Sequence, residues 1–171
     1  MTNAPTINER VTSVARTIPG HFSLDENVHG RVTAWIALTS KDDLFAATRS
    51  LKAIGARLSM ITAFADKTVG FNTIAYHFDI EGSTVTLKVL LEIGGSVDTI
   101  VPLFRNADWH EREFMEFYDI KMNGRTDNRR LFLDDSVDGR VMQRLIPLSV
   151  LSNAASTTML FEKLITVREK Q

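Results

Sequence analysis

The feature that most constrains the fold is a pair of alternating segments joined by a short connection. In Thr84–Ile93 every second side chain is apolar and most of the intervening ones are polar, and Phe71–Ile80 shows a similar alternation. A period of two is typical of a strand with one buried face. The connection Glu81-Gly82-Ser83 is typical of an antiparallel hairpin. The chain is therefore expected to build a sheet around this hairpin.

Further strands and a helix are predicted before the hairpin. Arg31–Thr39 alternates and predicts a half-buried strand, whereas Leu58–Ala65 is mostly apolar and predicts a central strand. Between them, Ser40 is placed to cap a helix whose apolar residues recur every three or four positions. Gly55 stands where the left-handed residue that ends such a helix belongs.

Two more helices are predicted after the hairpin, over Val97–Phe104 with Ser96 as cap, and from Asn106 to about Tyr118. We divide the chain into an irregular N-terminal segment, residues 1–29, which includes a short helix around Ile7–Thr17, an α+β domain, residues 30–135, and a C-terminal extension, residues 136–171. The predicted fold class is α+β: a single domain with a mixed or antiparallel sheet of about four to five strands flanked by helices, followed by a charged C-terminal extension.

The composition excludes several kinds of site. The chain has no cysteine, so it holds no disulfide, thiolate-bound zinc or Fe–S cluster of its own. Its net charge is −1, and acids interleave with bases throughout the charged stretch Arg105–Arg144, so we expect no nucleic-acid partner. No apolar run approaches the roughly 20 residues of a membrane helix, and the N-terminus lacks a signal peptide. We expect a soluble chain, or one peripheral on a larger assembly.

Motifs for catalysis are also absent. The sequence has no HExxH pair, no GxSxG elbow and no phosphate-binding glycine loop. His77-x-Asp79 offers two metal ligands without a third. We therefore predict no catalytic, cofactor-binding or metal-binding residue. A stand-alone small-molecule enzyme or binder that uses His110, Glu111 and Glu113 remains an alternative.

The predicted helix after Asn106 has a face suited to burial. Phe114, Phe117 and Tyr118 share this face and should pack on the sheet. Asp108 and Glu111 have the spacing of a capping box, in which the side chains satisfy the first free amides of a helix.

The opposite face of this helix carries Trp109 together with Arg112 and Glu116, which are four residues apart and able to pair. A tryptophan in such a place is unusual for a free surface. Two interpretations stay open: the chain's own charged extension covers Trp109, or Trp109 docks a partner protein.

One stretch of the chain combines several short motifs at fixed distances. They are Ala107-Asp108-Trp109, Glu111-Arg112-Glu113, Glu116, Tyr118, Ile120, Gly124 and Arg129-Arg130-Leu131-Phe132-Leu133-Asp134. With these residues the stretch resembles the signature region of the family formed by the C subunit of NADH dehydrogenase, which includes the complex I protein and its relatives in membrane-bound, energy-converting NiFe hydrogenases. The order of the preceding strands also matches, so the resemblance covers roughly residues 30–135.

The sequence departs from the family pattern at several places. Glu116 stands where the family usually has Asp, Asp119 replaces a usual glycine, and Arg125-Thr126 replaces a usual His-Pro. The later PLRKD-type motif is not visible. These departures favour the short hydrogenase-type members, such as the one in the carbon-monoxide-induced hydrogenase, over a standard member of complex I.

The resemblance implies a non-catalytic structural subunit of an energy-converting NiFe hydrogenase. Such a complex couples electron transfer to protons with ion translocation. The resemblance also implies that the subunit itself holds no cofactor. The implied partners are the hydrogenase-type large subunit and the Fe–S small subunit, which would carry the NiFe centre and the Fe–S clusters. The chain would lie peripherally on the cytoplasmic side of the cell membrane. The alternative within the family is the C subunit of the respiratory NADH:quinone oxidoreductase. The predicted docking residues are Trp109, Glu111, Arg112, Glu113, Glu116, Arg129 and Arg130.

Overall fold

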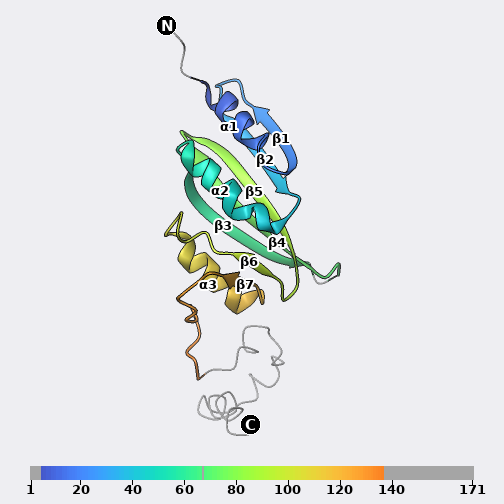
Figure 1. The fold of residues 1–171 in the computed structure, drawn as a ribbon, viewed down its shortest axis with the longest axis vertical. Helices are drawn as coiled ribbons and strands as arrows, with labels where there is room; N and C mark the ends of the chain where they lie inside the picture. Colours follow the sequence, from blue (N-terminus) through green and yellow to red (C-terminus); the bar gives the residue numbers. More distant parts are fainter. Residues whose placement is uncertain (1–4, 67, 137–171) are drawn as a thin grey trace, which may run out of the picture. The chain divides into compact units, whose positions relative to one another are not determined.

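The computed structural model describes residues 5–66 and 68–136. The chain divides into two compact units, residues 1–128 and residues 129–171. The helices and strands of the described residues all belong to the first unit (Figure 1). Apart from Ser136, the predicted extension 136–171 lies outside the described residues.

The first unit is built on a five-stranded mixed sheet of order β1-β2-β5-β4-β3. β2 and β5 are parallel, and the other neighbours are antiparallel. This arrangement confirms the predicted fold class. The strands are β1 (Gly20–Glu26), β2 (Val32–Leu38), β3 (Arg57–Asp66), β4 (Phe71–Ile80) and β5 (Ser83–Glu92).

The hairpin that anchors the prediction is β4–β5, which closes with Ile80 opposite Ser83. Its two turn residues, Glu81 and Gly82, have φ values of 51° and 83°. A two-residue turn with positive φ at both positions matches the twist of the flanking strands. Glycine adopts such a φ without steric cost, which explains Gly82 at this place.

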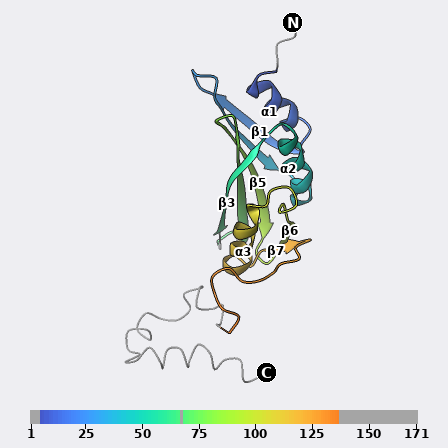
Figure 2. The ribbon, with the colours of Figure 1, turned by 90° about the vertical axis from the view of Figure 1, so that its left-hand side faces the viewer.

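Among the described residues, three helices accompany the sheet: α1 (Ile7–Ala15), α2 (Leu44–Ala53), preceded by the 3-10 turn η1 (Lys41–Asp43), and α3 (Ala107–Phe117). A small parallel sheet joins β6 (Ser96–Asp98) to β7 (Lys121–Asn123). Seen edge-on in Figure 2, α1 and α2 lie on one side of the strands. No described helix covers the other side.

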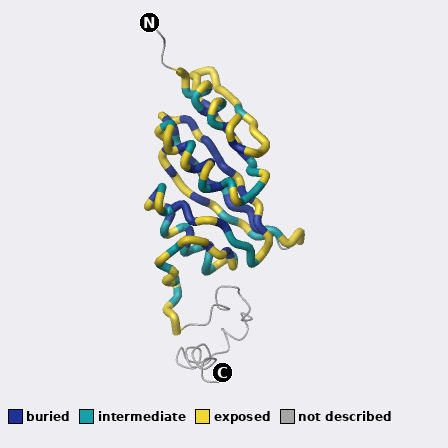
Figure 3. The backbone as a smooth tube through the Cα atoms, viewed as in Figure 1, coloured by how far each residue is buried: buried dark blue, intermediate teal, exposed yellow. Residues whose placement is uncertain are grey.

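One hydrophobic core lies between the sheet and the helices (Figure 3). The predicted helix after Ser40 is confirmed: Ser40 accepts a hydrogen bond from the Asp42 amide at 3.2 Å, and Gly55 follows the helix with φ 87°. The alternating strand residues point inward as predicted. The buried residues of β2, β4, β5 and α2 include Val32, Ala34, Ile36, Ile74, Tyr76, Phe78, Val85, Leu87, Val89, Leu44, Ala47 and Leu51.

The position of β3 corrects the prediction of a central strand. β2 and β3 run in the same direction, and α2 connects them along the chain. The β4–β5 hairpin fills the space between them, which leaves β3 at the edge of the sheet. Strand order is thus set by the crossover and not by how apolar a strand is.

Other segments also differ from the prediction. Residues 1–29 contain the expected short helix but also an edge strand, β1, where irregular structure is predicted. The polar segment after α3 begins with the strand β7. The helix predicted over Val97–Phe104 is wrong, because this segment holds the end of β6 followed by turns, and Ser96 lies in β6 instead of capping a helix. β-Branched residues and Pro102 disfavour a helix there.

Candidate functional site

α3 carries most of the predicted docking residues, and a buried stripe fixes its position. Ala107, Glu111 and Phe114 are all at most 1% exposed and follow one another at steps of four and three residues. Phe114 also packs edge-on against Tyr118, with ring centroids 6.1 Å apart. The helix is tied to the edge of the main sheet by Asn106, whose amide donates to the Leu58 carbonyl at 3.0 Å.

Glu111 is the unexpected member of this stripe, because it is a charged side chain with no exposed surface. Its Oε2 accepts hydrogen bonds from the Thr99 hydroxyl at 2.6 Å and from Arg125 Nη1 at 2.8 Å. Its Oε1 accepts from the Ile100 amide at 2.8 Å. Burial of a carboxylate is tolerated only when it is paired and hydrogen-bonded, and Glu111 meets both conditions.

Arg125 completes the network from the loop after β7. Its Nη2 donates to Asp108 Oδ1 at 2.6 Å, and its Nε donates to the Asp127 carbonyl at 2.9 Å. The side chain is only 3% exposed. Burial lowers the pKa of Arg125, but the hydrogen bonds to Glu111 and Asp108 outweigh this effect and leave it raised. Arg125 therefore stays charged and joins α3 to the loop after β7.

The network is structural in its geometry. The Glu111 carboxylate makes all the contacts given above within the chain, and it lies beside the core near Tyr76. Burial, and next the charge of Glu111, raise the pKa of Tyr76, so its phenol stays protonated. Within the described residues, no partner accepts or donates at the buried Tyr76 hydroxyl. This arrangement joins α3 to the loop after β7, and both oxygens of the Glu111 carboxylate are used within the chain.

His77 and Asp79 have different partners within the chain. Its ring nitrogens lie 3.2 Å from the Thr62 hydroxyl and 3.0 Å from the Thr86 hydroxyl, while Asp79 faces Arg57 at 3.5 Å. Nowhere in residues 5–66 and 68–136 do three or more His, Asp or Glu side chains gather as metal ligands would.

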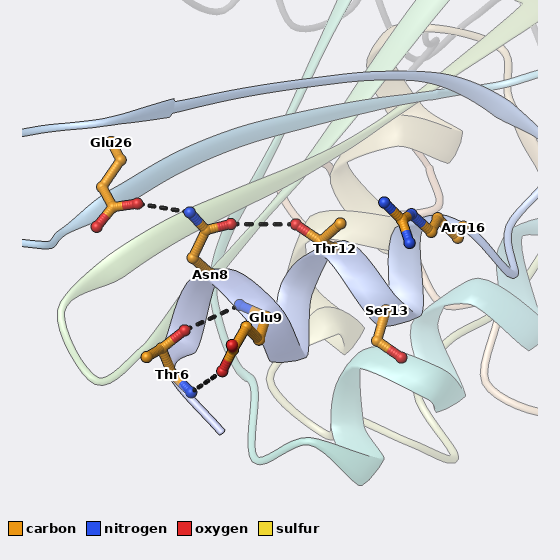
Figure 4. Close-up of a pocket in the computed structure, with 7 residues that line it drawn as sticks. All are labelled: Thr6, Asn8, Glu9, Thr12, Ser13, Arg16 and Glu26. Carbon is orange, nitrogen blue, oxygen red and sulfur yellow. Dashed lines mark hydrogen bonds between the residues drawn. The ribbon is translucent and has the colours of Figure 1, made fainter. Parts of the chain in front are cut away.

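A pocket beside α1 is lined by polar side chains, several of which bond to one another (Figure 4). Thr6 and Glu9 form a capping box at the start of the helix. Asn8 donates to Glu26 of β1 at 2.5 Å and accepts from the Thr12 hydroxyl at 3.1 Å. The Asn8–Glu26 bond joins α1 to β1, and the other bonds stabilise α1 itself.

The comparison with known proteins gives this geometry its context. A family model described as the 30 kDa subunit of the respiratory-chain NADH dehydrogenase matches residues 37–150. The chain belongs to this family. The range that matches the 30 kDa subunit family includes α3 and the buried Glu111–Arg125 network.

Relatives in the 30 kDa subunit family match over part of their length. The C subunit of NADH-quinone oxidoreductase from Rhodopseudomonas palustris (strain TIE-1) is 35% identical over 78 residues, which is 44% of this chain and 38% of the relative. The J subunit of NAD(P)H-quinone oxidoreductase from Prochlorococcus marinus is 28% identical over 111 residues, 58% of this chain and 64% of the relative. This chain thus spans less than two thirds of each of these relatives.

A solved structure shares the fold. A chain of the membrane-bound sulfane sulfur reductase, an archaeal respiratory membrane complex, matches with a TM-score of 0.66 and 14% identity, over 88% of this chain and 92% of that one. The fold of the 30 kDa subunit family thus extends to that complex. In the part of the chain that the structure describes, no helix is long and apolar enough to span a membrane.

The structure separates the seven predicted docking residues into three groups. Trp109 is 70% exposed on α3, and three other predicted docking residues of this helix, Arg112, Glu113 and Glu116, are half-buried. Arg129 and Arg130 belong to the second unit, where Arg130 donates to the Asp134 carbonyl at 3.1 Å. Glu111 is buried, so its place on a docking surface is corrected: its carboxylate serves the interior of the chain.

Two other details of the helix prediction are wrong. Phe117 is 38% exposed, because the buried stripe runs through Glu111 instead. Asn106 is the N-cap residue, and Glu111 bonds to Thr99 and Ile100 instead of forming a capping box with Asp108. Sequence reasoning also missed Arg125 as the buried partner of Glu111. The available signal was an acidic residue at an apolar spacing, which requires a buried cation elsewhere in the chain.

Proposed function

We propose that this chain is a non-catalytic structural subunit of a membrane-bound respiratory complex related to complex I, and that it docks a large subunit of that complex through the outward face of α3. Family membership and the fold support this proposal. So does the chemistry of the signature stretch, whose buried charges form a scaffold inside the chain.

The observation that carries the proposal is the exposure of Trp109. Its side chain is 70% exposed on α3, a helix whose opposite face is buried in the chain. Tryptophan and arginine dominate the energetics of protein interfaces, since each buries a large surface and loses little conformational freedom when its helix is already fixed. Arg112 is on the same helix. We assign Trp109 as the anchor and Arg112, Glu113 and Glu116 as the polar surround, with Arg129 and Arg130 as further contacts from the second unit.

We further propose that the complex is an energy-converting NiFe hydrogenase, with the NiFe centre and Fe–S clusters in the large and small subunits. The support is the departure from the family pattern, above all Arg125-Thr126 in place of His-Pro. Arg125 belongs to the buried network. The replacement of His-Pro by Arg125-Thr126 therefore alters the interior of the chain and not an exposed position. The chain would then lie peripherally on the cytoplasmic side of the cell membrane and bind no nucleic acid.

The test is a pull-down of the tagged full-length chain from detergent-solubilised native membranes, with mass spectrometry of the co-purifying proteins. A nickel-containing large subunit and ion-translocating membrane subunits are expected. A flavin-containing NADH-oxidising module would instead identify the C subunit of an NADH:quinone oxidoreductase, the alternative favoured by the names of the curated relatives. A chain that purifies alone would refute the subunit proposal and reopen the stand-alone enzyme.

The anchor assignment has its own test. Trp109→Ala and Arg112→Ala should each abolish recovery of the complex while the purified chain keeps its circular dichroism spectrum and melting temperature. Phe22→Ala, which removes another partly exposed aromatic ring, from β1, is the matched control and should leave recovery intact. Normal recovery with both α3 variants would remove this helix from the interface.

A further inference from the structure

The main sheet has a second face that points away from α1 and α2 (Figure 2). The strand register aligns the side chains of this face in rows across β2, β5, β4 and β3. One row runs Trp35, Thr86, His77 and Met60, and another runs Leu90, Thr73 and Phe64. We call this surface, made by these two rows and the row between them, the outer face.

Large apolar side chains stand at the four corners of the outer face. Trp35, Met60, Phe64 and Leu90 are each between 45% and 56% exposed. Trp35 leans toward His77, with an edge-on ring contact at 6.4 Å. A cluster of half-exposed large apolar side chains on one face is typical of a surface that another protein covers.

The row between the corners consists of small side chains around one cation. The register places Ala37, Lys88, Ala75 and Thr62 side by side in this row. Lys88 is exposed and is the one Lys, Arg, Asp or Glu in these three rows. Among the described residues, no carboxylate forms an ion pair with it. A single lysine surrounded by apolar corners requires an acidic partner once water is excluded.

We propose that the outer face docks an amphipathic helix of a partner subunit, whose apolar stripe is interrupted by one Asp or Glu that pairs with Lys88. The inference rests on the proposed function, which places this chain in a multisubunit complex. The two rows of large side chains are four residues apart along the strands, or about 13 Å. A helix is about 10–12 Å wide, so its projecting side chains meet the small row while its flanks contact the corners.

A second copy of this chain fits the outer face less well. In a two-fold dimer each copy presents the same patch to the other. A residue at the centre of that patch, as Lys88 is, then meets its own counterpart. Two ammonium groups desolvated against each other are strongly unfavourable, whereas a helix with a carboxylate neutralises the same charge.

The experiment uses the absence of cysteine from the chain, because any introduced thiol is then unique in this subunit. Thr62→Cys places a thiol in the small row, and Ser50→Cys places one at a partly exposed position of α2 as the matched control. The rate of alkylation is measured for each variant as purified chain and in the complex isolated from native membranes. A thiol-attached benzophenone then links the Thr62→Cys chain to whatever covers it, and mass spectrometry identifies the joined peptide.

We expect the complex to slow alkylation of Thr62→Cys at least about tenfold relative to Ser50→Cys. The joined peptide should come from a partner subunit and carry an acidic residue within an apolar helical repeat. Lys88→Glu should weaken retention of the chain in the complex at least about tenfold, and reversing the acid of that peptide should restore it. Lys121→Glu, an exposed lysine on β7, is the control for the charge change.

Several outcomes overturn the inference. Two results would reject the partner helix even when the chain co-purifies with its complex. One is an equal rate of alkylation of Thr62→Cys in the purified chain and in the complex. The other is a joined peptide that comes from a second copy or from this chain itself. Circular dichroism of each variant separates loss of docking from loss of fold. A wild-type chain that co-purifies with no membrane complex refutes the proposed function and this inference together.

Discussion

Removal of Arg125 should destabilise the fold far more than removal of any exposed arginine. Arg125→Met keeps a long side chain but leaves the fully buried Glu111 carboxylate without its cation. Breaking a buried ion pair from one side typically costs about 3–5 kcal/mol, because the remaining charge stays desolvated. For a unit of this size the loss corresponds to a fall in melting temperature of about 10–20 °C.

Glu111→Gln should cost less, about 1–3 kcal/mol. The amide oxygen can still accept from the Ile100 amide, and Arg125 keeps Asp108 at 2.6 Å. The double variant, Glu111→Gln with Arg125→Met, should lose less stability than the two single losses added together. Once Glu111 is an uncharged glutamine, Arg125→Met no longer leaves a buried carboxylate without its cation. The expected coupling is about 1–3 kcal/mol.

The assay is urea denaturation of the purified chain followed by far-ultraviolet circular dichroism for the wild type, both single variants and the double variant. Arg105→Met, on the exposed turn before α3, is the control and should stay within about 0.5 kcal/mol of the wild type. Two results would refute the reasoning: an Arg125→Met loss as small as that of the control, or strictly additive losses in the double variant.

Three further predictions follow from buried or strained groups. Tyr76→Phe should leave stability at neutral pH equal or slightly higher, since the hydroxyl is buried without a described partner. Burial raises the pKa of Tyr76, so above the ordinary tyrosine value of 10.0 the unfolded chain loses this proton first and the wild type should lose stability. Tyr76→Phe should lose less over the same pH range, and urea midpoints measure the difference. Burial lowers the pKa of His77, so the unfolded chain takes up a proton at this ring first and stability should fall as pH drops below 6.5. His77→Gln should reduce this dependence of stability on pH, which urea midpoints measure. Gly82→Ala should lower the melting temperature through a strain of about 1 kcal/mol, because Gly82 has a φ of 83°.

The sequence predicts well those features that depend on neighbouring residues. The β4–β5 hairpin and α2 follow from local alternation and from Ser40 and Gly55. The exposure of Trp109 follows from its position relative to the buried stripe of one helix. The partners of Glu111 could not be predicted in this way, because Thr99 and Arg125 lie 12 and 14 residues away along the chain.

The error about β3 has a physical cause that links it to the outer face. A strand that is apolar on both sides is typical of the middle of a sheet, where both faces are buried. In this chain β3 is an edge strand, and Met60 and Phe64 remain about half exposed on the outer face. β3 therefore carries more apolar side chains than the isolated fold buries. If a partner helix covers the outer face, both sides of β3 become buried, and the pattern matches the assembled subunit instead of the free chain.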